Sequence, residues 1–292
     1  NVMPGTSVQQ QLTGLTPGTQ YFLRAWTFDE YGFQAYVSYG ATATASVDQN
    51  TSVLVSVPTR ATLYGNARRL VRDSTGKLYA ATLRNTGPLI TVSSSTDDGA
   101  TWQRMTGAPS ETALDTGHQP ALAIGSNDNV YMVWVRDDLN DFVRFSSFTG
   151  TSWSQASDLA DDFTGLSKPA IALDSYNGLH VVWQRGVTDI RYSSSSDRGA
   201  TWSAEQVIFT GSAADPSIAV DRNNLPHGVF ASGGDVFYSS RACSGWCTAV
   251  KIDDTANAQE VPQISVAPGG NLHVVFRERE PALGPYQLRH AE

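Results

Sequence analysis

Short runs in which apolar and polar residues alternate follow one another along the whole chain. Each run covers five to eight residues and is broken by Gly, Asn, Asp or Ser, and no segment sustains a helical period for three turns. Alternation with a period of two is typical of a strand that buries one face. The pattern therefore predicts a protein that is almost entirely β.

One apolar template recurs at a nearly fixed spacing. Its clear copies are HQPALAIGSNDNVYMVW (118–134), SKPAIALDSYNGLHVVW (167–183), DPSIAVDRNNLPHGVF (215–230) and VPQISVAPGGNLHVVF (261–276), and a divergent copy, ARRLVRDSTGKLYAATL, covers 67–83. The prolines at 120, 169, 216 and 262 are 49, 47 and 46 residues apart. Each copy predicts a hairpin, because an apolar strand is followed by a Gly/Asn/Asp turn and a second strand.

A second hairpin follows most copies of the template. It is clearest in LITVSSSTDDGATW (89–102) and IRYSSSSDRGATW (190–202), and weaker in RFSSFTGTSW (144–153) and FYSSRACSGW (237–246). The tryptophans that close these segments, at 102, 153, 202 and 246, are 51, 49 and 44 residues apart. Four strands in each repeat of about 45 to 50 residues indicate a β-propeller built from four-stranded antiparallel blades.

The turn S-x-D-x-G-x-T-W occurs intact twice in these second hairpins. The two copies are Ser95, Asp97, Gly99, Thr101, Trp102 and Ser195, Asp197, Gly199, Thr201, Trp202. The motif resembles the Asp-box, or bacterial neuraminidase repeat, of sialidases and other propeller families. In such a turn Asp accepts backbone N–H groups, Gly supplies a positive φ, and Trp is buried between sheets. These residues are structural in the family, so the resemblance indicates a fold more than an activity.

The resemblance covers roughly residues 60–292. Four copies have all four strands, whereas the fifth stops at YQLRHAE. We therefore expect four complete blades and one partial blade, with a truncated C-terminus, because sialidases resemble six-bladed propellers. An alternative is that VLVSVP (53–58) supplies the outer strand of the last blade, which would remove an exposed edge.

Residues 1–47 do not belong to the repeats of the later part of the chain. The segment LTGLTPGTQYFLRAWTFDEYG (12–32) resembles the later half of a fibronectin type III domain, in which Tyr21 would make the tyrosine corner. About forty residues cannot form a sandwich core alone. The prediction is a partial module over 1–47, through which the protein could assemble with another chain, and a linker or closing strand over 48–59.

Composition excludes several classes of partner and site. The chain has 292 residues, with 20 Lys+Arg and 28 Asp+Glu, so its formal charge of −8 argues against nucleic-acid binding. No apolar run approaches the ~18 residues of a membrane span, and no signal peptide is visible. The chain has no nucleotide-loop, zinc-protease or calcium-loop motif, so neither a cofactor nor a metal is expected.

The two cysteines, Cys243 and Cys247, lie four residues apart. They are read as either a local disulfide or a pair of free thiols, and we predict the disulfide. A zinc site is disfavoured because none of the five histidines lies in that turn. With few lysines and many Ser, Thr and Gly, the pair favours an oxidising location, either secreted or at the cell surface.

Alternation of strand direction predicts where a ligand should be sought. If the Asp-box turn joins the third and fourth strands, the loops from strand two to three and between blades share the opposite face, where sialidases carry their active site. Three arginines take equivalent places there: Arg84, Arg136 and Arg185. They predict a shared anion site. The alternative is that neighbouring aspartates pair with them.

The sialidase catalytic set is incomplete in this sequence. The R-I-P motif of the family is absent, because Arg69 is followed by Leu70 and Val71. No Tyr and Glu pair is unambiguous, although Glu260, Glu278, Glu280 and Tyr286 come late in the chain. We therefore expect an extracellular or cell-surface module, without catalytic activity, that binds glycans or proteins or builds a surface assembly. The alternative is a sialidase-like glycoside hydrolase completed by sequence outside this fragment.

Overall fold

We describe a computed structural model of the chain. The residues whose structure is described are 20–28, 34–42, 68–83, 89–108, 117–136, 141–162, 165–253, 255, 257–279 and 286–292, with backbone alone described for 20–28, 34–42, 162 and 286. All the regular structure in these ranges is β-strand.

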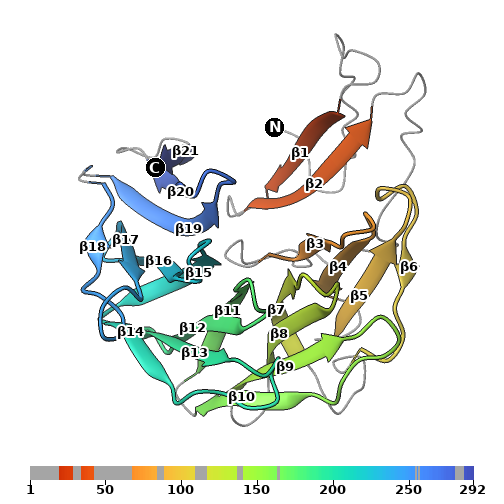
Figure 1. Ribbon diagram of the computed structural model, residues 1–292. Coiled ribbons are helices and arrows are strands. Elements are labelled where there is room, and N and C mark those ends of the chain that lie inside the picture. The colour runs from red at the N-terminus through yellow and green to blue at the C-terminus, as the bar shows by residue number, and fades with distance from the viewer. Residues whose placement is uncertain are drawn as a thin grey trace.

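Five antiparallel sheets follow one another around an arc, in chain order, as the blades of a propeller (Figure 1). The first blade contains β3 (Leu70–Arg72), β4 (Leu78–Leu83), β5 (Ile90–Ser95) and β6 (Gln103–Arg104). The second contains β7 (Gly117–Ile124), β8 (Val130–Arg136), β9 (Asp141–Phe148) and β10 (Ser157–Asp162). The third contains β11 (Leu166–Leu173), β12 (Leu179–Arg185), β13 (Asp189–Ser195) and β14 (Gln206–Thr210).

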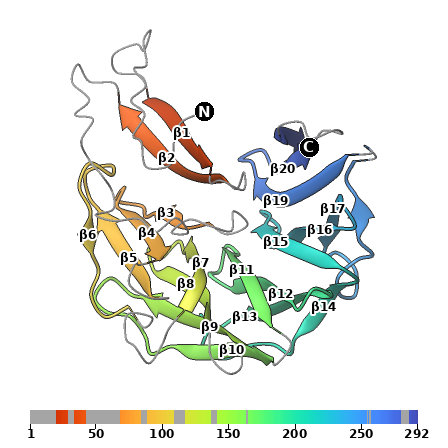
Figure 2. The ribbon, with the colours of Figure 1, turned by 180° about the vertical axis from the view of Figure 1, so that it is seen from behind.

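The fourth blade contains β15 (Ala213–Val220), β16 (Pro226–Ser232), β17 (Asp235–Ser240) and β18 (Val250–Lys251), and the fifth contains β19 (Ala258–Val266), β20 (Leu272–Arg279) and β21 (Tyr286–Ala291). The prediction of four complete blades and one partial blade is confirmed. The first strands of the blades lie toward the centre of the arc, and outer strands such as β6, β10 and β14 lie at its periphery (Figure 2).

A separate hairpin, β1 (Gln20–Phe28) and β2 (Gln34–Thr42), forms a two-stranded sheet. It falls within the region that resembles a fibronectin type III domain, which stays a prediction. The linker at 48–59 and the alternative closing strand at 53–58 lie outside the described residues.

The hydrophobic core is divided among the junctions between blades. Four clusters join the first blade to the second, the second to the third, the third to the fourth, and the fourth to the fifth. Trp134 and Trp183, which end the apolar template in two copies, are fully buried at successive junctions. The second, third and fourth blades therefore each contribute to two of these clusters and are covered on both faces, which explains the nearly continuous apolar runs of their templates.

The prolines of the template mark a bulge in the inner strands of the second, third, fourth and fifth blades. The register of pairing shifts in β7, β11, β15 and β19 around the proline. The residue before each proline has a left-handed φ: Gln119 (55°), Lys168 (54°), Asp215 (54°) and Val261 (51°). Such bulges re-aim side chains and bend the strand. This left-handed conformation was not predictable from the sequence, because a residue before proline favours an extended backbone.

The two S-x-D-x-G-x-T-W turns have the same internal hydrogen bonds. In each, one Asp carboxylate oxygen accepts the Thr backbone N–H at 2.8 Å and the Ser hydroxyl at 2.7 Å, while the other accepts the Thr hydroxyl. These hydrogen bonds, led by those from Thr101 and Thr201, lower the pKa of Asp97 and of Asp197 to about 2.

The fourth blade replaces this network with a covalent link. Cys243 and Cys247 form a disulfide with 5.2 Å between their Cα atoms, which confirms the predicted pairing. The hydroxyl of Ser239 donates to the carbonyl of Cys247 at 2.7 Å, as the hydroxyl of Ser193 donates to the carbonyl of Ser203 in the third blade. The disulfide therefore closes the same hairpin that the Asp closes elsewhere.

Candidate functional site

The strand order defines two faces of the propeller. What we call the turn face carries the turns between the first and second strands and between the third and fourth strands of each blade. The loop face carries the connections from the second to the third strand and from one blade to the next. The sequence predicted that a ligand should be sought on the loop face.

A cavity of about 610 Å³ lies on the loop face between the second and third blades, and we call it the loop cavity. Its lining comes from the start of β7, β9 and β11, the end of β12 and the loop after it: His118, Asp141, Gly165, Leu166, Ser167, Gln184, Gly186 and Val187. Its volume is in the range of small-molecule sites. One carboxylate, one imidazole and several neutral polar groups thus line an open depression.

Two glycines shape the floor of the loop cavity. Gly165 (φ 90°) and Gly186 (φ 55°) both have left-handed backbones, and the Gly186 N–H donates to the Gly165 carbonyl at 2.6 Å. A Cβ added at Gly165 would lie 3.6 Å from a carboxylate oxygen of Asp141. The two loops therefore meet through their backbones, with the Asp141 carboxylate directly beside them.

Gln184 is the unusual residue of the loop cavity. Its side chain is buried, with 6% of the residue exposed, and its amide nitrogen donates to the Gly186 carbonyl at 2.7 Å. Its amide oxygen is buried and has no hydrogen-bond partner among the residues that the structure describes. The equivalent positions in the second and fourth blades are Val135 and Ala231. Buried polar atoms are normally satisfied, so this oxygen lacks a donor that an ordered water or a ligand hydroxyl would supply.

The bulged residues of the inner strands link neighbouring blades near this face. The side-chain oxygen of Gln119 accepts the backbone N–H of Lys168, and the Lys168 ammonium lies 2.7 Å from a carboxylate oxygen of Asp215. The Lys168 and Asp215 side chains are 21% and 17% exposed. The sequence analysis did not single out these residues, although their common place before proline was a signal.

The three predicted arginines have different surroundings. Arg136 and Arg185 end the equivalent strands β8 and β12; the Arg136 guanidinium lies 5.6 Å from the centre of the Phe142 ring, and that of Arg185 lies 3.8 Å from Glu205. Arg84 lies outside the described residues. A shared anion site at these arginines therefore stays a prediction.

In the fifth blade an acidic residue, Glu278, occupies the strand position that Arg136 occupies in the second blade. Glu278 pairs with Gln259 in the register in which Arg136 pairs with Gly117. Its side chain is 1% exposed and forms an ion pair with Arg289. Hydrogen bonds from Thr255 and Arg289 lower its pKa.

Glu260, another late-chain candidate for catalysis, is also held in an ion pair. The carboxylate of Glu260 accepts from the Arg277 guanidinium, with a contact of 3.0 Å. Glu280 and the side chain of Tyr286 lie outside the described part of the chain. Glu260 and Glu278 are thus both held in ion pairs within the sheet of the fifth blade.

Two buried histidines lie on the turn-face side of the third and fourth blades. A ring nitrogen of His180 lies 2.7 Å from the Tyr192 hydroxyl, and one of His227 lies at the same distance from the Tyr238 hydroxyl. Their other ring nitrogens lie 3.4 and 3.5 Å from Asp174 and Asp221. Burial lowers the pKa of both histidines below the ordinary value of 6.5, so the neutral form is favoured.

Within the described ranges, no three or more His, Cys, Asp or Glu side chains are grouped so that they could hold a metal ion. The same ranges contain no apolar helix long enough to cross a bilayer.

Comparison with known proteins gives structural similarity alone. No family model matches the chain. No curated protein matches it either. A protein of unknown function from Dyadobacter fermentans has a similar structure, with a TM-score of 0.59 and 14% identity over 76% of this chain and 74% of that one. A PL25 ulvan lyase, a polysaccharide lyase, has a TM-score of 0.55 and 12% identity over 77% and 68% of the two chains.

An intramolecular trans-sialidase from Ruminococcus gnavus has a TM-score of 0.49 and 13% identity over 73% of this chain and 50% of that one. At these identities the matches establish a β-propeller fold and leave the function to be argued from the site.

Proposed function

We propose that this chain is an extracellular or cell-surface propeller of the Asp-box type, that it binds glycans through the loop cavity, and that it has no glycosidase turnover of its own. The observation that carries the proposal is the lining of the loop cavity, in which buried Gln184 has an unsatisfied carbonyl oxygen beside Ser167 and Asp141. Sugars present many hydroxyl donors, which meet such acceptors directly or through water.

Electrostatics favours a neutral glycan over an anionic one. The chain has a formal charge of −8, and Asp141 supplies a carboxylate to the described lining of the loop cavity, which contains no arginine or lysine among the described residues. A negative surface lowers the local concentration of anionic sugars. Glu260 and Glu278 are held in ion pairs by arginines, and neither is among the described residues that line the loop cavity.

The chemistry of the fourth blade supports the proposed location. Cys243 is exposed in a turn and forms a disulfide with Cys247. Exposed disulfides persist in oxidising compartments and are reduced in the cytosol. The partial fibronectin-like module at 1–47 would then tether the propeller to other modules or chains outside the cell.

The test is a binding titration with matched variants. Isothermal titration of the chain against neutral and sialylated oligosaccharides should give saturable binding of a neutral glycan. Gln184→Leu should weaken that binding by about tenfold, equivalent to ~1.4 kcal/mol. Gln263→Leu changes a half-buried glutamine outside the loop cavity and should leave binding unchanged.

Two results would contradict the proposal. Equal binding by both variants would remove the loop cavity from the site. Saturable hydrolysis of a sialoside by the chain, abolished by Arg136→Ala or Arg185→Ala, would favour a sialidase-like hydrolase instead.

A further inference from the structure

The turn face carries a repeated hydrogen bond between neighbouring blades. The backbone N–H of Ser74 donates to Asp128, that of Ser126 to Asn177, and that of Ser175 to Asn224, each at 2.8 Å. Each donor is the second residue of the turn between the first and second strands, and each acceptor lies in the corresponding turn of the next blade. We call these the inter-blade serine bonds.

The series ends between the fourth and fifth blades. Arg222 occupies the donor position, and Gly270 occupies the acceptor position, where Asp128, Asn177 and Asn224 stand in earlier turns. Glycine has no side-chain oxygen to receive the bond. Arg222 is exposed and forms no hydrogen bond or ion pair with any described residue.

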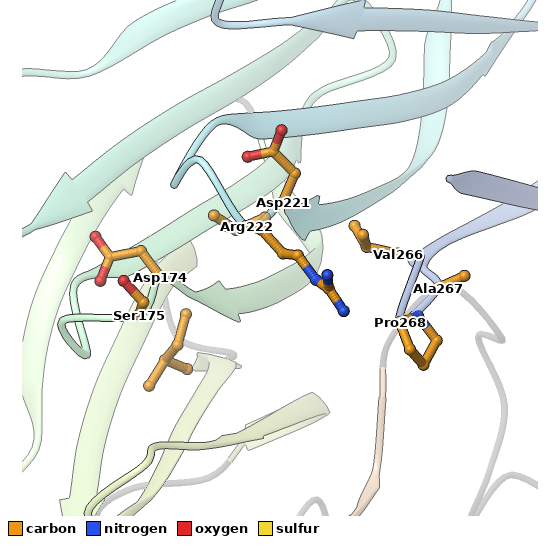
Figure 3. A pocket seen from close by; sticks show the side chains of 9 residues that line it. Asp174, Ser175, Asp221, Arg222, Val266, Ala267 and Pro268 are labelled. Atoms are coloured by element: carbon orange, nitrogen blue, oxygen red, sulfur yellow. The ribbon is translucent and has the colours of Figure 1, made fainter. Parts of the chain in front are cut away.

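A cavity of about 380 Å³ opens at this place, and we call it the turn cavity (Figure 3). Three turns line it, from the third, fourth and fifth blades: 173–175, 220–222 and 266–268. The Arg222 side chain extends into it, toward Val266 and Pro268 and away from the two labelled aspartates (Figure 3). The cavity therefore combines an apolar wall with one guanidinium that has no partner in the described ranges.

The two aspartates that line the turn cavity, Asp174 and Asp221, form hydrogen bonds within their own turns. One carboxylate oxygen of Asp174 accepts the N–H groups of Tyr176 and Gly178, at 2.9 and 2.6 Å, and the other faces His180. Asp221 is held in the same way by its own turn and by His227. Hydrogen bonds from backbone N–H groups stabilise an ionised carboxylate and occupy its acceptor positions. Arg222 is therefore the charged group whose donors remain available.

We propose that the turn cavity binds a carboxylate carried on an apolar or ring-shaped carbon skeleton. The Arg222 guanidinium offers forked donors that fit both carboxylate oxygens, and its backbone N–H is a further donor. Val266, Ala267 and Pro268 would contact the carbon skeleton. An acidic sugar and a peptide with a free C-terminus share this chemistry. The site lies on the opposite face from the loop cavity and does not depend on the proposed glycan binding.

The experiment measures binding of glucuronate and of N-acetyl-Ala-Ala with a free carboxylate, by chemical shift or calorimetric titration of the chain. Glucose and the dipeptide amide are the uncharged counterparts. We expect saturable binding of at least one of the two carboxylates. Binding of glucuronate would indicate an acidic sugar as the ligand, and binding of N-acetyl-Ala-Ala would indicate a peptide C-terminus. Arg222→Gln should weaken it by about tenfold or more, because the variant loses the charge-assisted hydrogen bonds to the carboxylate.

Two further variants separate the turn cavity from a general charge effect. Arg198→Gln removes an exposed arginine of another turn on the same face and should leave binding unchanged. Gly270→Asn restores the acceptor found in the earlier turns, takes up the Arg222 N–H and should weaken binding several-fold. An added Cβ at Gly270 meets no atom within 4 Å, and Asn tolerates a left-handed backbone.

The proposal is overturned if neither carboxylate binds saturably. It is also overturned if Arg222→Gln binds as tightly as the original chain, or if the uncharged counterparts bind equally well.

Discussion

The glycines of the two S-x-D-x-G-x-T-W turns offer a matched test of packing between blades. Gly99 and Gly199 both have a φ of 90°, so alanine at either position carries the same backbone strain. Their surroundings differ. A Cβ at Gly99 would lie 3.6 Å from Trp102, whereas one at Gly199 would lie 2.1 Å from Cε1 of Phe145 in the preceding blade.

The expected loss of stability follows from these distances. A left-handed alanine costs about 1–2 kcal/mol, which sets the loss for Gly99→Ala. Overpacking adds about 1–3 kcal/mol, so Gly199→Ala should cost roughly 2–5 kcal/mol. Phe145 cannot yield freely, because it is 3% exposed and packs against Tyr131 at 6.2 Å and Trp202 at 5.3 Å between ring centres.

The assay is equilibrium unfolding in urea, followed by tryptophan fluorescence. The two alanine variants should differ by at least ~1 kcal/mol. Adding Phe145→Leu should relieve Gly199→Ala, so that the double variant is more stable than the sum of the single changes predicts. Equal losses for the two glycines, or strict additivity with Phe145→Leu, would refute the contact between blades.

Three further predictions concern the core, the histidines and the disulfide. Trp183→Ala should cost about 3–5 kcal/mol in urea unfolding, because Trp183 is fully buried between blades; a loss below ~1 kcal/mol would place it outside the core. Folding lowers the pKa of His180 and of His227, so near and below pH 6.5 these histidines bind more protons in the unfolded chain than in the folded protein. The free energy of unfolding should therefore decrease from pH 7.5 to 5.5, and replacing both histidines with Gln should flatten that slope; an unchanged slope would contradict it. Cys243→Ser with Cys247→Ser should cost less than the ~3 kcal/mol of a fifteen-residue loop, because the cysteines are only four positions apart in the sequence. Thermal melts would measure this loss, and two alkylatable thiols in the unreduced native protein would refute the disulfide.

The architecture was predictable because it depends on periodic patterns. The spacing of the prolines and tryptophans places each blade, and the stopping point of the fifth repeat matches its three strands. Cys243 and Cys247 were predictable as a pair because no other partner exists in the chain. These features are local in the sequence, so a pattern suffices to reveal them.

The site residues depend on contacts between blades, which a pattern does not reveal. Gln184 stands in a strand that reads as core, and its unsatisfied oxygen appears only when the neighbouring blade is in place. Arg222 becomes distinctive through the absence of a side chain at Gly270, which is 48 residues away. The equivalence of Glu278 with Arg136 required the strand register, because the repeats are not equally long.

The division of the hydrophobic core among four junctions has a consequence for how the sequence can vary. Each cluster joins two adjacent blades, so a change in one blade is felt by two neighbours at most. A chain with a single shared core would transmit the same change to every element. The blades can therefore diverge semi-independently, which allows the fourth to hold its hairpin with sulfur chemistry while the first and third hold theirs with an aspartate.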